Sequence, residues 1–124
     1  MDCIFCKIKE GTIPSKKIYE DDLIMVIMDI SPNVDGHVLV IPKEHYTTFI
    51  DLPNDIIIHI NKVVKSLTPT LLKAMNVDSL TQINNYGTMQ EVKHYHLHLL
   101  PNYGINLQAN KTVDESYEQI KKFL

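Results

Sequence analysis

The chain has 124 residues, enough for one domain with a hydrophobic core, and its 44% hydrophobic and 22% charged residues are ordinary for a globular protein. A formal net charge of −3 disfavours a nucleic-acid partner, because such proteins usually present a basic face. No apolar run is long enough to span a membrane, and the first residues lack the pattern of a signal peptide, so we expect a cytoplasmic protein with no membrane partner. All 12 basic residues are lysine, so a bound phosphate would have to be held without a guanidinium.

The N-terminal residues have apolar side chains at helical spacing, which predict a short helix with Asp2 as N-cap and Gly11 as its end. This helix carries Cys3 and Cys6 as a Cys-x-x-Cys pair. Two cysteines in a chain expected in the cytoplasm disfavour a structural disulfide. The pair fits half of a zinc site, a redox pair or two packed thiols, although no preceding strand supports the redox interpretation.

Four strands are predicted from the alternation and clustering of apolar residues before position 85. Residues 17–20 and 23–29 form a hairpin around Asp21 and Asp22, and the second of these strands is apolar on both faces and therefore central. A loop rich in turn residues leads to a third strand at 37–42, with His37 at its mouth, where a single histidine is more often a satisfied surface residue. The fourth strand covers residues 79–84.

Two further helices are predicted. Residues 53–75 have an amphipathic pattern, Pro69 should kink or divide that helix, and His59 lies among its apolar positions without an evident partner. A terminal helix over 113–124 has an apolar side made of Ile120, Phe123 and Leu124. Together the elements predict an α+β fold with a mostly antiparallel sheet of about five strands and helices packed against one side of it.

The fifth strand contains the most informative stretch, residues 94–100, in which three histidines alternate with apolar or aromatic residues. Successive side chains of a strand point to opposite faces, so His94, His96 and His98 should share one face. Because burying imidazoles is costly, this row indicates acid–base, nucleophilic or metal chemistry. One catalytic metal held by all three is disfavoured, since they span roughly 13 Å and metal–nitrogen bonds are near 2.1 Å.

The pattern His-φ-His-φ-His-φ-φ over residues 94–100 resembles the signature of the histidine triad family of nucleotide hydrolases and transferases. Other segments resemble the Hint-like branch of that family in order and spacing: residues 3–8, 13–15, 19–22, 29–32, 36–37, 39–45 and 90–94. The resemblance covers residues 1 to about 103. It implies that residues 1–124 are a single domain with the fold of this family.

The resemblance also implies a homodimer that acts on the α-phosphate of AMP-type or GMP-type purine nucleotides, such as nucleoside phosphoramidates or dinucleoside polyphosphates. His96 resembles the nucleophile that becomes transiently nucleotidylated, and neutral imidazole is a competent nucleophile near pH 7. His98 and His37 resemble the pair that hydrogen-bonds to the α-phosphate oxygens. Asp29 resembles the carboxylate that binds the ribose hydroxyls, and the wall of the base pocket would consist of Ile4, Phe5, Ile8, Ile27 and Ile30.

Bacterial members with this Cys-x-x-Cys pair bind a structural zinc, and by position the ligands here would be Cys3, Cys6, His45 and His94. Two thiolates and two imidazoles make a closed tetrahedral zinc site.

The loop over residues 84–91 departs from the family pattern, because it is one residue short and has Met89 where glycine is expected. Asn84 and Gln90 are candidates for contact with the phosphate or leaving group, and Glu91 stands where some members have a serine that contacts the leaving group. A negative charge at Glu91 would favour leaving groups that bear an amine. A nucleotide-binding scaffold or regulatory protein with little turnover would use the same residues, so it is the alternative function.

Overall fold

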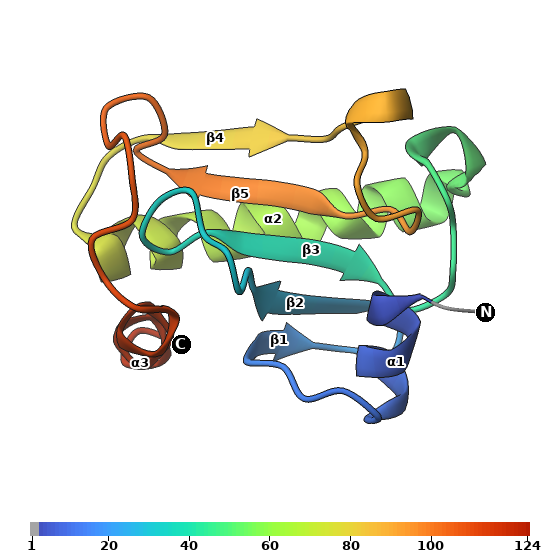
Figure 1. The fold of residues 1–124 in the computed structure, drawn as a ribbon, viewed down its shortest axis with the longest axis horizontal. Coiled ribbons are helices and arrows are strands. Elements are labelled where there is room, and N and C mark those ends of the chain that lie inside the picture. The colour runs from blue at the N-terminus through green and yellow to red at the C-terminus, as the bar shows by residue number, and fades with distance from the viewer. Residues whose placement is uncertain (1–2) are drawn as a thin grey trace.

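The computed structural model describes residues 3–124, which form a five-stranded sheet and three α-helices (Figure 1). The strands lie in the order β1-β2-β3-β5-β4, and all neighbours are antiparallel. Their bounds are β1 Lys17–Glu20, β2 Ile24–Met28, β3 Val38–Pro42, β4 Leu80–Ile83 and β5 Leu97–Pro101. The predicted α+β fold is therefore confirmed, including the hairpin and the central position of the second strand.

Helices cover both faces of the sheet, which corrects the expectation that they lie on one side. Helix α2 (Asn54–Met75) runs behind the strands in Figure 1, and it shares a core with α3 (Val113–Lys121) and with the side chains of Val26, Val40 and Leu99. Helix α1 (Ile4–Glu10) lies on the other face. There Cys3 and the α1 residues Phe5 and Ile8 form a second apolar cluster with the strand residues Met25, Ile27, Leu39 and Ile41. The central strands β2 and β3 are buried on both faces, so each face needs a cover.

The helix ends differ in part from the sequence predictions. Asp2, the predicted N-cap of α1, lies outside the described residues, and the cap observed is Cys3, whose Sγ accepts a hydrogen bond from the Cys6 N–H at 3.3 Å. Gly11 ends α1 in a left-handed conformation, as predicted. Helix α3 ends at Lys121, and of its predicted apolar side only Ile120 is buried, whereas Phe123 and Leu124 are exposed.

Helix α2 is continuous through Pro69, so of the two predicted outcomes, a kink or a division, the division is wrong. Pro69 lies on the exposed side, where water can hydrate the backbone carbonyl that loses its intrahelical partner. None of the described helices is both long and apolar enough to cross a membrane.

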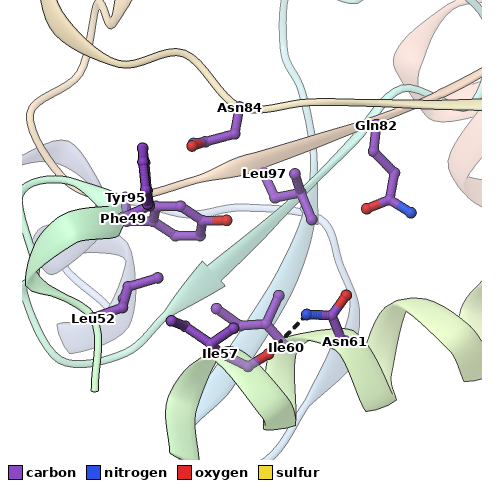
Figure 2. A pocket seen from close by; sticks show the side chains of 9 residues that line it. All are labelled: Phe49, Leu52, Ile57, Ile60, Asn61, Gln82, Asn84, Tyr95 and Leu97. Carbon is purple, nitrogen blue, oxygen red and sulfur yellow. Dashed lines mark hydrogen bonds between the residues drawn. The ribbon is translucent and has the colours of Figure 1, made fainter. Parts of the chain in front are cut away.

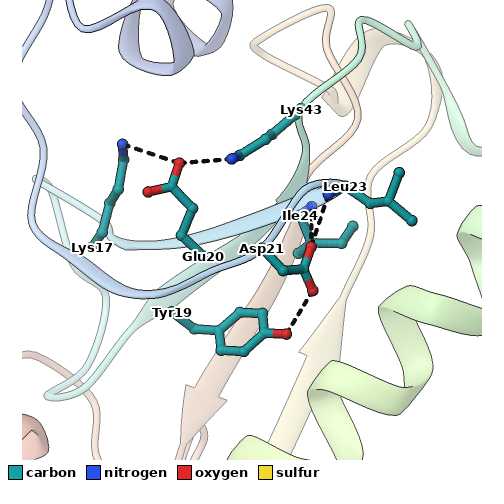
Figure 3. A network of polar contacts seen from close by, with 7 residues as sticks. All are labelled: Lys17, Tyr19, Glu20, Asp21, Leu23, Ile24 and Lys43. Atoms are coloured by element: carbon teal, nitrogen blue, oxygen red, sulfur yellow. Dashed lines mark hydrogen bonds and ion pairs between the residues drawn. The ribbon is translucent and has the colours of Figure 1, made fainter.

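Asp21 ties the β1–β2 turn to α2. One carboxylate oxygen accepts hydrogen bonds from the backbone N–H groups of Leu23 and Ile24, each at 2.8 Å, and the other accepts from the Tyr19 hydroxyl (Figure 3). That second oxygen also lies 2.6 Å from His59 Nε2, so His59 has a partner that sequence reasoning did not find. Partial burial acts to raise the pKa of Asp21, but these hydrogen bonds outweigh it and hold the pKa well below its usual range.

Candidate active site and metal site

A cavity of about 630 Å³ opens between α1, the ends of β2 and β3, and the loop over residues 85–92. It is lined by the side chains of His37, His96 and His98, which come from two different strands or their ends. Antiparallel pairing of β3 with β5 sets Leu39 opposite His98, and this pairing carries the neighbouring His37 to the same place. The chain therefore brings together the three histidines for which the sequence predicted catalytic roles.

The histidine row shares one face, as predicted, although β5 begins only at Leu97. Tyr95, Leu97 and Leu99 pack in the core on the α2 side. On the other side, the Phe5 ring lies edge-on to both His94 and His96, with centroids 5.6 and 5.1 Å away. Phe5 thus limits the rotation of the His96 ring inside the cavity.

His96 is held in one tautomer by the backbone. Its Nδ1 lies 2.8 Å from the carbonyl oxygen of His94. A carbonyl can only accept, so Nδ1 carries the proton and donates it. In the neutral ring, Nε2 then keeps its lone pair. A buried imidazole with a free Nε2 in a cavity is the arrangement that a nucleophile requires.

His37 and His98 form a hydrogen-bond relay that begins at the backbone of Asn33. The Asn33 N–H donates to His37 Nδ1 at 3.1 Å, so the proton of the neutral His37 ring sits on Nε2. That Nε2–H donates to His98 Nδ1 at 2.9 Å, and His98 in turn carries its proton on Nε2, as a donor. Burial lowers the pKa of His37 to about 4, although Asp29 opposes the change, and burial together with His96 lowers the pKa of His98. Both rings are therefore neutral hydrogen-bond donors near pH 7.

The ligand atoms of Asp29, His37 and His98 lie close enough together to hold a metal ion. The relay argues against a metal there, because His37 Nε2 would have to lose its proton while Nδ1 still accepts from Asn33. His94 points to a different cluster, so the three triad histidines do not share one ion.

Seven of the nine residues predicted to bind substrate line this cavity: Ile4, Phe5, Ile8, Ile27, Asp29, Ile30 and Glu91. Asp29 follows β2, and one of its oxygens accepts from the Ser31 N–H at 2.8 Å. Sequence reasoning assigned no role here to Ser31, Asn33, Leu39, Asn85 or Val92, which also line the cavity. The sequence contains no signal for the role of Asn33, because this residue contacts His37 through its backbone N–H, which almost every residue has.

The structure does not bring Asn84 and Gln90 to the histidines. Asn84 lines a separate cavity of about 290 Å³, whose apolar wall includes Phe49 and Leu97 (Figure 2). The Gln90 side chain is buried, and its amide donates to the carbonyl of Thr47 at 2.6 Å and to that of Val92 at 3.0 Å. Gln90 therefore braces the loop that carries Glu91.

Four possible metal ligands lie together at the N-terminal end of α1, with their ligand atoms within 4.8 Å of one another: Cys3, Cys6, His45 and His94. His94 Nδ1 lies 3.1 Å from His45 Nδ1 and 3.2 Å from Cys3 Sγ, and Cys6 Sγ lies 3.3 and 3.6 Å from the Nδ1 atoms of His45 and His94. Tetrahedral zinc with ordinary bond lengths sets nitrogen–nitrogen distances of about 3.3 Å and sulfur–nitrogen distances of about 3.6 Å. The four side chains therefore fit a zinc ion.

The surroundings of this cluster also suit a metal. His94 Nε2 donates to the Pro42 carbonyl at 2.8 Å, which leaves Nδ1 free to bind a cation. Burial, with Cys3 adding to it, raises the pKa of the Cys6 thiol to about 11, so a cation is needed to obtain the thiolate near pH 7. Because the carbonyl of His94 orients His96, the candidate metal site and the candidate nucleophile share one residue.

Comparisons with known proteins agree with this geometry. The sequence pattern of the HIT domain family matches residues 10–105. An uncharacterized HIT-like protein of Methanocaldococcus jannaschii is 44% identical over 103 residues, 82% of this chain and 79% of that one. An adenosine 5'-monophosphoramidase of Saccharomyces cerevisiae is 39% identical over 80% of this chain and 61% of its own length. The crystal structure of a zinc-bound histidine triad family protein from Mycobacterium smegmatis superposes with a TM-score of 0.88 at 30% identity, over 98% of this chain and 92% of the other. The chain belongs to the HIT domain family.

Proposed function

We propose that this protein hydrolyses purine nucleotides that carry an amine or a related group on the α-phosphate, and that His96 is the nucleophile. The observation that carries the proposal is the tautomer of His96 fixed by the His94 carbonyl, in which the Nε2 lone pair is free in a cavity of about 630 Å³, a volume usual for small-ligand sites. The yeast relative named as an adenosine 5'-monophosphoramidase supports an amine as the leaving group.

In the first step His96 Nε2 attacks the α-phosphorus, and the bond from phosphorus to the leaving nitrogen breaks. Its electron pair goes to that nitrogen, which takes one proton from solvent and departs as the amine. The His96 ring then carries positive charge, which the hydrogen bond from Nδ1–H to the His94 carbonyl stabilises. In the second step water attacks phosphorus, the electron pair returns to Nε2, and one proton is released to solvent.

The other cavity residues hold the nucleotide for this chemistry. The Nε2–H of His98 is a donor for a phosphate oxygen, and His37 orients that ring through the 2.9 Å hydrogen bond. Asp29 has the carboxylate for the ribose hydroxyls, and the apolar side chains of α1 and β2 offer a wall for the base. Zinc held by Cys3, Cys6, His45 and His94 would be structural, because four protein ligands leave no open position.

The test is hydrolysis of a fluorogenic adenosine phosphoramidate by the wild type and by His96→Ala, each with and without a chelator. We expect turnover that resists the chelator and is lost in His96→Ala, while AMP binding by calorimetry persists. His59→Asn, a histidine change outside the cavity, is the matched control and should retain turnover. If wild type binds AMP but turns over no phosphoramidate, the binding-protein alternative is correct. If His96→Ala retains turnover, His96 is not the nucleophile.

A further inference from the structure

The cavity that we assign to the substrate is acidic. Its lining contains the carboxylates of Asp29 and Glu91 and, among residues 3–124, no lysine. The chain has no arginine, so no guanidinium can compensate. His37, His96 and His98 are the basic side chains of the lining, and near pH 7 His37 and His98 are neutral. The fixed charge around a bound substrate is therefore negative.

The two carboxylates are engaged differently. Asp29 accepts a hydrogen bond from the Ser31 N–H, and its other oxygen lies 3.4 Å from His37 Nε2. Glu91 is exposed at the cavity and forms no ion pair with any residue of the described chain. Glu91 lines the same cavity as His96 and His98, and its negative charge acts on the His98 ring.

Lys93, two residues from Glu91, donates its hydrogen bonds to backbone carbonyls and not to the Glu91 carboxylate. Its ammonium donates to the carbonyls of Gly87 and Gln90 at 3.0 and 2.6 Å. These contacts hold the loop around the 3-10 turn Gly87–Met89, and Gln90 is itself pinned through its buried amide. The loop therefore holds the backbone of Glu91 in place, and within residues 3–124 no cation forms an ion pair with its carboxylate.

We propose, building on the hydrolase function above, that Glu91 selects nucleotidyl substrates whose leaving group carries a positive charge. The preferred class is the phosphoramidate of an amine that bears a second, protonated amino group. A leaving group that is itself an anion, such as sulfate, phosphate or a polyphosphate, meets an uncompensated carboxylate instead. A unit charge about 6 Å from Glu91 at an effective dielectric near 40 would change the rate constant about tenfold, and added salt would weaken this effect.

The experiment compares three adenosine phosphoramidates with amine groups of equal length, tipped by an ammonium, a neutral methyl or a carboxylate. The readout is the ratio of their kcat/KM values in wild type, Glu91→Gln and Glu91→Lys at low salt. Glu118→Gln, which removes one negative charge from an exposed position on α3, is the matched control for net charge.

We expect wild type and Glu118→Gln to favour the ammonium-tipped substrate over the neutral one by about tenfold, Glu91→Gln to lose most of that preference, and Glu91→Lys to favour the carboxylate-tipped substrate. Equal ratios in wild type and Glu91→Gln, with the neutral substrate still hydrolysed, would overturn the role of Glu91 and leave the hydrolase intact. If wild type hydrolysed none of the three substrates, both proposals would be overturned.

Discussion

Protonation of His37 should weaken the folded state as the pH falls below about 6.5. The His37 side chain is 2% exposed, and burial lowers its pKa from 6.5 to about 4. Between these two pH values the unfolded chain binds more protons than the folded one, so the free energy of unfolding decreases as the pH falls. This part of the stability is fully present above pH 6.5 and is lost as the pH drops toward 4.

The size of the effect follows from the two pKa values. At pH 5 the difference corresponds to a loss of about 2 kcal/mol relative to pH 7.5, because each tenfold difference in proton affinity is worth about 1.4 kcal/mol. For a urea m-value of about 2 kcal/mol per molar, the midpoint of unfolding should fall by about 1 M.

The assay is urea unfolding of wild type and His37→Gln at pH 7.5 and pH 5. Acid also weakens metal binding, but both proteins retain the four candidate zinc ligands, so the comparison between them removes that contribution. Wild type should lose about 2 kcal/mol more than His37→Gln over this range. If the two proteins lose the same free energy, His37 is not a buried neutral base and the relay to His98 is wrong.

Three further predictions concern the metal site, the hairpin and the loop before His37. Cys6→Ser should lower the zinc content of the purified protein, measured by mass spectrometry of the metal; zinc content equal to wild type would exclude Cys6 as a ligand. Asp21→Asn should lower the free energy of unfolding by about 1–3 kcal/mol in urea titrations, because the Tyr19 hydroxyl and His59 lose their charged acceptor. Gly36→Ala should lower the melting temperature in calorimetry, because the backbone has φ +79° and a Cβ would lie 2.7 Å from Met75 Cγ; an unchanged temperature would contradict that packing.

Most of the fold follows from local patterns that the sequence displays directly. The alternation in residues 94–100 gives the two faces of the strand, since side chains of a strand alternate whatever their partner. The apolar residues on both faces of β2 indicated its central position. The prediction that helices cover only one side was wrong, because a strand that is apolar on both faces needs a cover on each and the short helix α1 supplies the second.

The parts that could not be predicted depend on contacts between distant residues or on the backbone. His59 meets Asp21 across 38 positions, and no pattern within α2 indicates that partner. The tautomers of His37 and His96 are set by a backbone N–H and a backbone carbonyl, which every residue has, so side-chain identity carries no information about them. Gln90 was a candidate for substrate contact, but the structure turns its amide to two carbonyls of the chain.

If His96 forms a covalent nucleotidyl intermediate, the products formed from that intermediate should not depend on the leaving group of the substrate. Adenosine phosphoramidates with several different leaving amines would be hydrolysed in water containing a fixed fraction of methanol, and the ratio of AMP methyl ester to AMP measured. A shared nucleotidyl-His96 has already lost its leaving group when water or methanol attacks, so the ratio should be the same for every substrate. A ratio that changes with the leaving amine would show direct attack of solvent on the substrate and contradict the covalent role of His96.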